Sequence, residues 1–295
     1  MILAKNPVSN LLLALFLIVP AFLSATTGAI TLSGGDSYVG DLKNGKPHGE
    51  GTLNFKDGAV YEGNFVKGLR EGFGIQTFED GSTYEGNWKR GYMDGKGNYD
   101  FACGHEYKGE FVRGKMQGTG TMLLANGEIY EGAWKMGKAD GKGSFTRIDG
   151  SKFMGISKAG KRHGAGMIVW QSDDAMSATW NKNKVNGTSS FNFANGDALS
   201  LTWKNGKPGK ASYVATNGTT INGSIKNIIT KINNNQQLNG ADANVAIVLY
   251  AIAMEYKAQK NNTAAKQFFN LAQTQPNADQ KQVAKMATAQ LQQMN

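Results

Sequence analysis

Side chains that could bind a metal ion or act as a nucleophile are few in this sequence. The 295 residues include three histidines, His48, His105 and His163, and one cysteine, Cys103. His48 and His163 occupy the same position of a repeating pattern, five repeats apart, so they cannot share a metal ion within one chain. Cys103 and His105 are close in sequence, but two ligands do not complete a metal site. We therefore expect no metal, and a single cysteine excludes an intramolecular disulfide.

Carboxylates that could act as acids or bases recur in a pattern that favours a structural role. Glu62, Glu85 and Glu131 occupy one repeated position, which indicates a polar ladder across neighbouring strands. No nucleophile occurs together with a plausible base. The Gly-x-Gly pairs lie between predicted strands, whereas a phosphate-binding loop needs a helix N-terminus after its glycines. We predict a protein without catalytic residues or cofactor, and not an enzyme.

These residues belong to a repeat of 23 residues. The 39 glycines against 5 prolines indicate one repeated backbone requirement. An aromatic residue and a glycine two positions later define each repeat. The defining pairs are Tyr38 and Gly40, Tyr61 and Gly63, Tyr84 and Gly86, Tyr107 and Gly109, and Tyr130 and Gly132, continued by Phe153 and Gly155.

Each repeat is predicted to form a β-hairpin. In residues 61–65 two aromatic residues and a glycine share one face, because side chains alternate along a strand. Dipeptides that tolerate positive φ recur in phase and favour tight hairpin turns. They are Asp57-Gly58, Asp80-Gly81, Asn126-Gly127, Asp149-Gly150 and Asn195-Gly196. A single hairpin cannot bury its apolar face, so the hairpins should stack into a long antiparallel sheet whose glycines leave room for neighbouring rings.

The pattern Tyr, Gly two residues later, Gly seven residues later and then a Gly-x-Gly pair resembles the MORN repeat. The resemblance is close over residues 38–152 and holds for a sixth copy at 153–175, in which Asp173 replaces the closing glycine. Two degenerate copies follow to about residue 225. The expected fold class is mainly β, an elongated antiparallel sheet of stacked MORN hairpins over 38–225, plus a small C-terminal α-helical segment. The resemblance implies a module for protein association, self-association or membrane placement.

Helical periodicity replaces strand periodicity after an Asn/Gln-rich stretch. The spacing of Leu249, Ile252, Ala253, Tyr256, Ala265, Phe269 and Ala272 resembles one tetratricopeptide (TPR) helix pair. We expect a TPR-like segment over 241–295, with a third helix over about 278–293. Tyr256 and Phe269 would contact a partner if it binds peptides. In the alternative, the segment only covers the last strand of the sheet.

The first 25 residues have the layout of a secretory signal peptide. A basic residue, Lys5, precedes an apolar run and then small residues. Cleavage after Ala25 fits best, and cleavage after Ala29 or an uncleaved membrane anchor remains an alternative. We expect an exported protein, periplasmic or secreted, with residues 1–25 removed.

The net charge of +9 is distributed unevenly. Residues 38–175 carry 19 basic and 18 acidic residues, whereas residues 176–240 carry seven lysines and one aspartate. Lys182, Lys184, Lys204 and Lys207 therefore define a candidate basic face for an anionic partner, with solvated lysines as the alternative. Nucleic acid is not expected, because export removes the target and no basic helix is present.

Two functions are compatible with these features. The first is a non-catalytic scaffold of the bacterial cell envelope that holds another envelope protein through the sheet and the helical tail. The second is a peripheral binder of membrane lipid or glycan, through the basic region 176–240 and the aromatic face of the sheet. The open first edge of the sheet would also allow a homodimer.

Overall fold

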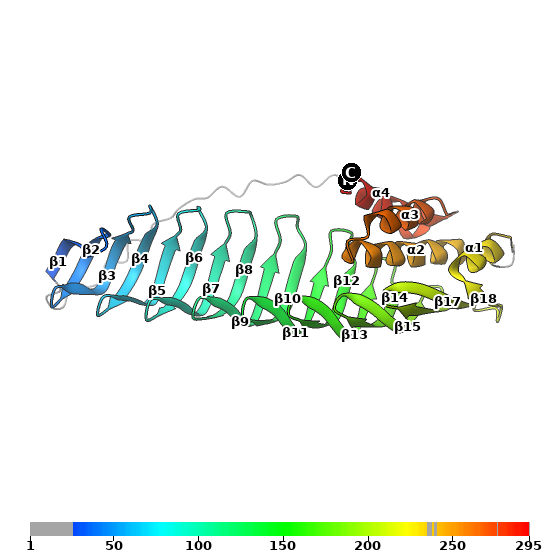
Figure 1. The fold of residues 1–295 in the computed structure, drawn as a ribbon, viewed down its shortest axis with the longest axis horizontal. Helices are drawn as coiled ribbons and strands as arrows, with labels where there is room; N and C mark the ends of the chain where they lie inside the picture. The colour runs from blue at the N-terminus through cyan, green and yellow to red at the C-terminus, as the bar shows by residue number, and fades with distance from the viewer. Residues whose placement is uncertain (1–25, 235–237, 239–240, 276, 295) are drawn as a thin grey trace.

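The protein is an elongated antiparallel sheet with helices over one end (Figure 1). The computed structural model describes residues 26–234, 238, 241–275 and 277–294. Its 18 strands form one sheet, and each strand pairs with the strand that follows it in sequence. The strands are β1 (Thr26–Thr31), β2 (Ser37–Lys43), β3 (Lys46–Asn54), β4 (Val60–Val66), β5 (Leu69–Thr77), β6 (Thr83–Lys89), β7 (Tyr92–Asp100), β8 (Glu106–Val112), β9 (Lys115–Leu123), β10 (Ile129–Lys135), β11 (Lys138–Thr146), β12 (Lys152–Lys158), β13 (Lys161–Val169), β14 (Ala175–Asn181), β15 (Lys184–Asn192), β16 (Ala198–Lys204), β17 (Lys207–Val214) and β18 (Thr220–Ser224). The expected fold class is confirmed.

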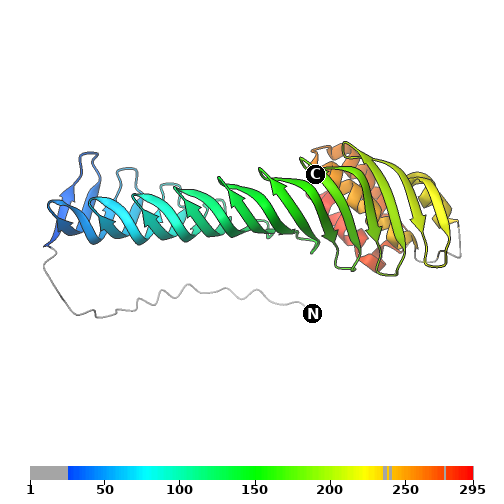
Figure 2. The ribbon, with the colours of Figure 1, turned by 90° about the horizontal axis from the view of Figure 1, so that it is seen from below.

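The C-terminal helices pack together over the last repeats. They are α1 (Ile225–Asn233), α2 (Ala241–Ala258), α3 (Asn262–Gln273) and α4 (Val283–Gln292), with a short 3-10 helix at Ala278–Lys281 before α4. Figure 2 shows the sheet twisting along its length, with the helices behind its final strands. Among the described residues, no helix is long and apolar enough to cross a membrane. The expected signal peptide lies outside the described residues.

The sheet begins earlier than the repeat pattern predicted. β1 precedes Tyr38 and pairs with β2 along its whole length, placing Gly28 opposite Gly40. It therefore adds a half repeat to the array at the first edge.

Glycines face one another across most of the sheet and form a continuous row. The row comprises Gly28, Gly40, Gly51, Gly63, Gly74, Gly86, Gly97, Gly109, Gly120, Gly132, Gly143, Gly155 and Gly166. In the degenerate repeats the same line continues through Ala178, Ser189, Leu201 and Ala211. The row is thus bare of side chains from β1 to β13, carries them from β14 to β17, and ends with Gly223 on β18, opposite Ala211.

Two kinds of turn alternate along the array, and this corrects the turn prediction. Lys67 and Gly68 join β4 to β5 with φ of 53° and 85°, so both central residues adopt the left-handed conformation of a two-residue hairpin turn. At the Asp57-Gly58 site only the glycine has positive φ. There the carboxylate of Asp57 accepts a hydrogen bond from the Ala59 N–H at 3.0 Å, and the loop is longer. The Asp-Gly and Asn-Gly pairs therefore mark turns between repeats, while the tight turns lie within repeats.

Over the last repeats the helices cover the face of the sheet on which the regular repeats carry their tyrosine rings. Residues 245–253 of α2 are all buried, because the helix lies between the sheet and the other helices. A single core joins α2, α3 and α4 to the inner face of the last repeats, with Phe153, Trp180, Leu199 and Leu201 among its members. The helices expected over 241–295 are present. They cover the face of the last repeats as well as the last strands, and α1 follows β18 directly.

Candidate ligand-binding pocket between sheet and helices

A ladder of edge-to-face aromatic rings runs along the inner face of the regular repeats. From the second to the fifth repeat, the residue four positions after the tyrosine forms the rung. Phe65 contacts Tyr38 and Tyr61, each with ring centroids 5.1 Å apart and planes nearly perpendicular. Trp88, Phe111 and Trp134 form the next rungs at 5.1–5.2 Å. Each rung thus joins two repeats, which stiffens the array.

The tyrosine rings of the ladder lie directly over the glycine row. A Cβ on Gly97 would lie 2.5 Å from the Tyr84 hydroxyl oxygen, so only glycine fits beneath this ring. The Tyr84 hydroxyl donates to the Asn87 carbonyl at 2.9 Å, which satisfies the residue at the β-bulge. Tyr38, Tyr61, Tyr107 and Tyr130 make the equivalent bond. The defining residues are therefore packing residues.

The ladder is interrupted at repeat six. The position of the rung is occupied by Ser157, which has no ring. A second repeated position, nine residues after the aromatic, holds Arg70, Met93 and Met116 in earlier repeats but Ala139 next to the gap. Two large side chains are therefore missing at neighbouring places on the inner face.

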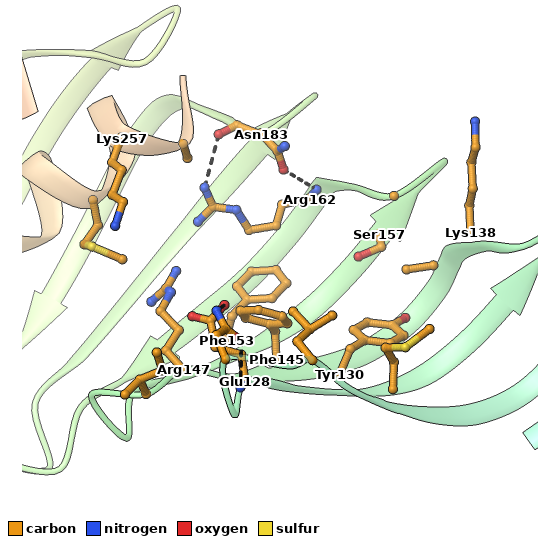
Figure 3. Close-up of a pocket in the computed structure, with 18 of the residues that line it drawn as sticks. Glu128, Tyr130, Lys138, Phe145, Arg147, Phe153, Ser157, Arg162, Asn183 and Lys257 are labelled. Carbon is orange, nitrogen blue, oxygen red and sulfur yellow. Dashed lines mark hydrogen bonds between the residues drawn. The ribbon is translucent and has the colours of Figure 1, made fainter. Parts of the chain in front are cut away.

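A cavity of about 760 Å³ occupies this place, between the end of the ladder and the helices (Figure 3). This volume is in the range of ligand-binding pockets. The sheet contributes Tyr130, Trp134, Phe145, Arg147, Phe153, Ser157 and Arg162, and the helices contribute Met254, Lys257, Gln290 and Gln293. We call this cavity the junction pocket.

Cationic groups approach the junction pocket from both sides. In Figure 3 Lys257 descends from the helices and Arg147 rises from the sheet, whereas Lys138 extends away. The Lys257 ammonium donates to the amide oxygens of Gln290 at 2.5 Å and Gln293 at 3.3 Å.

Both cations lie in a partly desolvated place. Burial lowers the pKa of Lys257, and the nearby Glu128 opposes this shift. Burial also lowers the pKa of Arg147, and the neighbouring Arg162 adds to that effect. An anionic ligand would counteract these shifts, since an opposite charge favours the charged form of each base.

The helices are fixed to the sheet by buried polar contacts. Arg162 donates to Glu255 at 2.8 Å, and the two side chains are only 13% and 1% exposed. Lys281 pairs with Asp174 at 2.5 Å. Tyr250 donates to the Asp149 carboxylate. Breaking such a buried pair leaves an uncompensated charge, so these contacts fix the position of the tail.

The predicted basic residues gather at the tight turns, on one side of the last repeats. Lys182 and Lys184 belong to the tight turn between β14 and β15, and Lys204 and Lys207 flank the next tight turn. All four are exposed. Lys184, Lys204 and Lys207 line one open depression of about 570 Å³ together with Gln259 of the helical segment.

The two predicted partner-binding residues of the tail differ in position. Tyr256 is partly exposed and stacks on Phe268, with centroids 5.6 Å apart. Phe269 is fully buried against Tyr250, so it offers no surface to a partner in this fold and its role is packing.

The residues first considered for chemistry are dispersed. Nδ1 of His105 accepts a hydrogen bond from the Ala125 N–H at 2.8 Å and so ties one loop to the next. Cys103 is exposed. Glu62 and Glu85 are exposed on the face opposite the tyrosines, where both flank Ile75 in the register of β5. Within the described ranges, no three His, Cys, Asp or Glu side chains gather as metal ligands would.

The fold and the ladder define a β-hairpin repeat protein. Six consecutive segments match the MORN repeat family, at residues 38–60, 61–83, 84–105, 107–129, 130–152 and 153–175. The chain therefore contains six MORN repeats, followed by two strand pairs of the same geometry that the family comparison does not match.

Comparisons with other proteins show only distant likeness. No curated protein matches the chain. Among solved structures, the TCP domain of SAS-4 from Drosophila melanogaster has 15% identity and a TM-score of 0.32, covering 55% of this chain and 97% of its own. The TCP10 domain of CPAP from Danio rerio has 13% identity and a TM-score of 0.35, covering 67% and 99%.

The junction pocket was missed from the sequence, although a signal was present. Aligned by the repeat, Ser157 and Ala139 are small residues at positions that hold large side chains in the preceding repeats. The contribution of Lys257 could not be foreseen, because it depends on where the helices dock.

Proposed function

We propose that this protein is an exported, non-catalytic interaction scaffold of the cell envelope, which holds a partner protein at the junction pocket. The observation that carries this proposal is the pocket itself, which neither the sheet nor the helices form alone. The MORN repeats support an interaction role, because such arrays build extended binding surfaces.

Rigidity supports the scaffold role. The aromatic ladder connects consecutive repeats, and hydrogen bonds to side chains tie several loops to the corresponding loop of the neighbouring repeat. Examples are the Arg90 N–H bonded to Glu71 at 2.9 Å and the Arg113 N–H bonded to Asp94 at 3.2 Å. A surface held in this way binds with little loss of conformational entropy.

Export through residues 1–25 is part of the proposal. Cleavage after Ala25 would leave β1 (Thr26–Thr31) intact, whereas cleavage after Ala29 would remove most of this strand. We expect N-terminal sequencing of protein from the periplasmic or secreted fraction to begin at Thr26. A full-length N-terminus in the membrane fraction would indicate an uncleaved anchor instead.

Site-specific photocrosslinking in the native cell tests the scaffold role. A photoreactive residue is placed at Ile148, which lines the junction pocket and is 54% exposed, and in a control at Tyr92 of β7, which is 56% exposed. We expect a partner adduct from position 148 and not from position 92. No adduct from either position would refute the scaffold, and an adduct with a second copy would indicate self-association.

The lysine depression favours a second candidate function, attachment to an anionic lipid surface. Three lysines around one open depression create a local positive potential. Cosedimentation with vesicles that contain phosphatidylglycerol would test it. Reversing the charge of Lys184, Lys204 and Lys207 should abolish binding, while reversing Lys46 at the other end should not. Binding equal to that of the unaltered protein would exclude this function.

A further inference from the structure

The gap in the aromatic ladder at Ser157 is bordered by the same kinds of residue that contact a rung in the other repeats. A rung contacts the aromatic residues of its own and the preceding repeat, so a ring above Ser157 would meet Tyr130 and Phe153. Trp180 already contacts Phe153 from the other side, with centroids 5.2 Å apart. Edge-to-face contacts stabilise a pair of aromatic rings beyond the effect of burial alone. A ring from a ligand could therefore fill the gap above Ser157 and make the contacts that a rung makes in the regular repeats.

Among the described residues, neither Lys257 nor Arg147 forms an ion pair with a carboxylate, although the Glu128 carboxylate lines the same pocket. The two ion pairs among the described residues are Arg162 with Glu255 and Lys281 with Asp174, and neither involves Lys257 or Arg147. Lys257 is held by two neutral amides, and Asn126 donates to the Glu128 carboxylate at 3.0 Å. Asp149, whose charge raises the pKa of Arg147, already accepts hydrogen bonds from Tyr250 and Ser151. The pocket thus offers a positive charge next to a ring-sized gap.

We infer that the junction pocket binds the C-terminal residue of a partner protein when that residue is aromatic. Its ring completes the ladder above Ser157, and its terminal carboxylate pairs with Lys257. A C-terminal aromatic residue is the simplest segment that joins a ring to a carboxylate, and the cavity of about 760 Å³ also has room for the residues before it. This inference rests on the proposed role of the pocket in partner binding.

Peptide titration against the mature protein tests the occupant. The probes are N-terminally fluorescein-labelled Gly-Ser-Gly-Ser-Phe with a free carboxylate, the same peptide as an amide, and the same peptide ending in alanine. Fluorescence anisotropy should show saturable binding of the first, at least about tenfold weaker binding of the amide, and none of the alanine peptide. Equal binding of all three would overturn the inference. If N-acetylphenylalanine competes with an affinity equal to that of the peptide, the ligand is a small aromatic acid and not the end of a partner protein. That result would also overturn the inference.

Two variants of the pocket test separately the contribution of the ring site and the contribution of the Lys257 charge to peptide binding. Ser157→Phe restores the residue found at this position in other repeats, so it should fold, raise the melting temperature and abolish peptide binding. Lys257→Gln should reduce binding of the carboxylate peptide to that of the amide. Lys285→Gln, at an exposed position of α4, is the matched control and should change nothing. Undiminished binding to folded Ser157→Phe would refute the inference.

Crosslinking distinguishes failure of the occupant from failure of the scaffold. If position 148 still crosslinks to its partner in the Ser157→Phe variant, the scaffold stands and the ring insertion is wrong. The unaltered protein could instead give no crosslink and still bind the carboxylate peptide as expected. The proposed specificity of the pocket would then be supported, and the proposed role as an envelope scaffold would be refuted.

Discussion

Replacing Gly97 by alanine should destabilise the array, because its place in the glycine row lies under the ring of Tyr84. The added Cβ would lie 2.5 Å from the Tyr84 hydroxyl oxygen and 2.6 Å from its Cζ. The ring cannot move aside, since it is fully buried and contacts Trp88 at 5.2 Å and Phe111 at 5.1 Å. The φ of Gly97 is not in the left-handed region, so the effect is steric and not conformational.

The expected loss follows from three contributions. Overpacking a well-packed place by one methyl group costs about 1–3 kcal/mol. Displacing the ring weakens the hydrogen bond from Tyr84 to the Asn87 carbonyl, which contributes about 1 kcal/mol. Alanine loses less backbone entropy than glycine on folding, which offsets about 0.5–1 kcal/mol. The net loss in the free energy of unfolding should be about 1–3.5 kcal/mol.

Urea denaturation followed by tryptophan fluorescence measures this loss, since Trp88 contacts the ring of Tyr84. Gly34→Ala is the matched control, because its Cβ would meet nothing within 4 Å. In a Tyr84→Val background, Gly97→Ala should cost almost nothing, because the ring is gone. The reasoning is refuted if Gly97→Ala destabilises no more than Gly34→Ala, or if its cost persists without the ring.

Three further predictions follow from the contacts described above. Glu255→Gln leaves Arg162 buried without its partner, so the tail should detach at a cost of about 3–5 kcal/mol and become sensitive to limited proteolysis; an unchanged cleavage pattern would contradict this. Burial raises the pKa of Tyr61 and of Tyr107 to about 12. Their contribution to stability is therefore complete below about pH 10, the ordinary pKa of tyrosine, and is lost as the pH rises to about 12. The urea midpoint should fall from about pH 10 to about pH 12, and a flat profile over that range would argue against this prediction. Ala159 has φ of 50° in a tight turn, so Ala159→Asn should raise the melting temperature by about 1–3 °C in a calorimetric scan.

The sheet was predictable from the sequence because the repeat encodes its own packing. A tyrosine and the glycine beneath it are both visible in the period, so the six regular repeats follow from spacing alone. Turn chemistry was less visible: the tight turns contain residues such as Lys67 before glycine, which do not favour positive φ. Stacking with neighbouring repeats overrides that local preference.

The site was largely hidden from sequence reasoning, for a physical reason. Where helices pack on a sheet depends on the shapes of both faces, and neither shape is periodic in the sequence. The replacement of glycines by Ala178, Ser189 and Leu201 was noticed in part as degeneracy. These side chains occur where the C-terminal helices, instead of tyrosine rings, pack on the sheet. Likewise α1 was missed, although Ile225, Ile228 and Ile232 have the spacing of a helix face.

Attachment of the helices to one end of the array has an evolutionary consequence. Repeats between β4 and β9 contact only their neighbours, so whole units could be duplicated or lost there without disturbing the pocket. Each unit would change the separation between the pocket and the free edge at β1 by roughly 10 Å, at about 4.8 Å per strand. Related proteins could therefore differ in reach by fixed increments while capturing the same type of ligand.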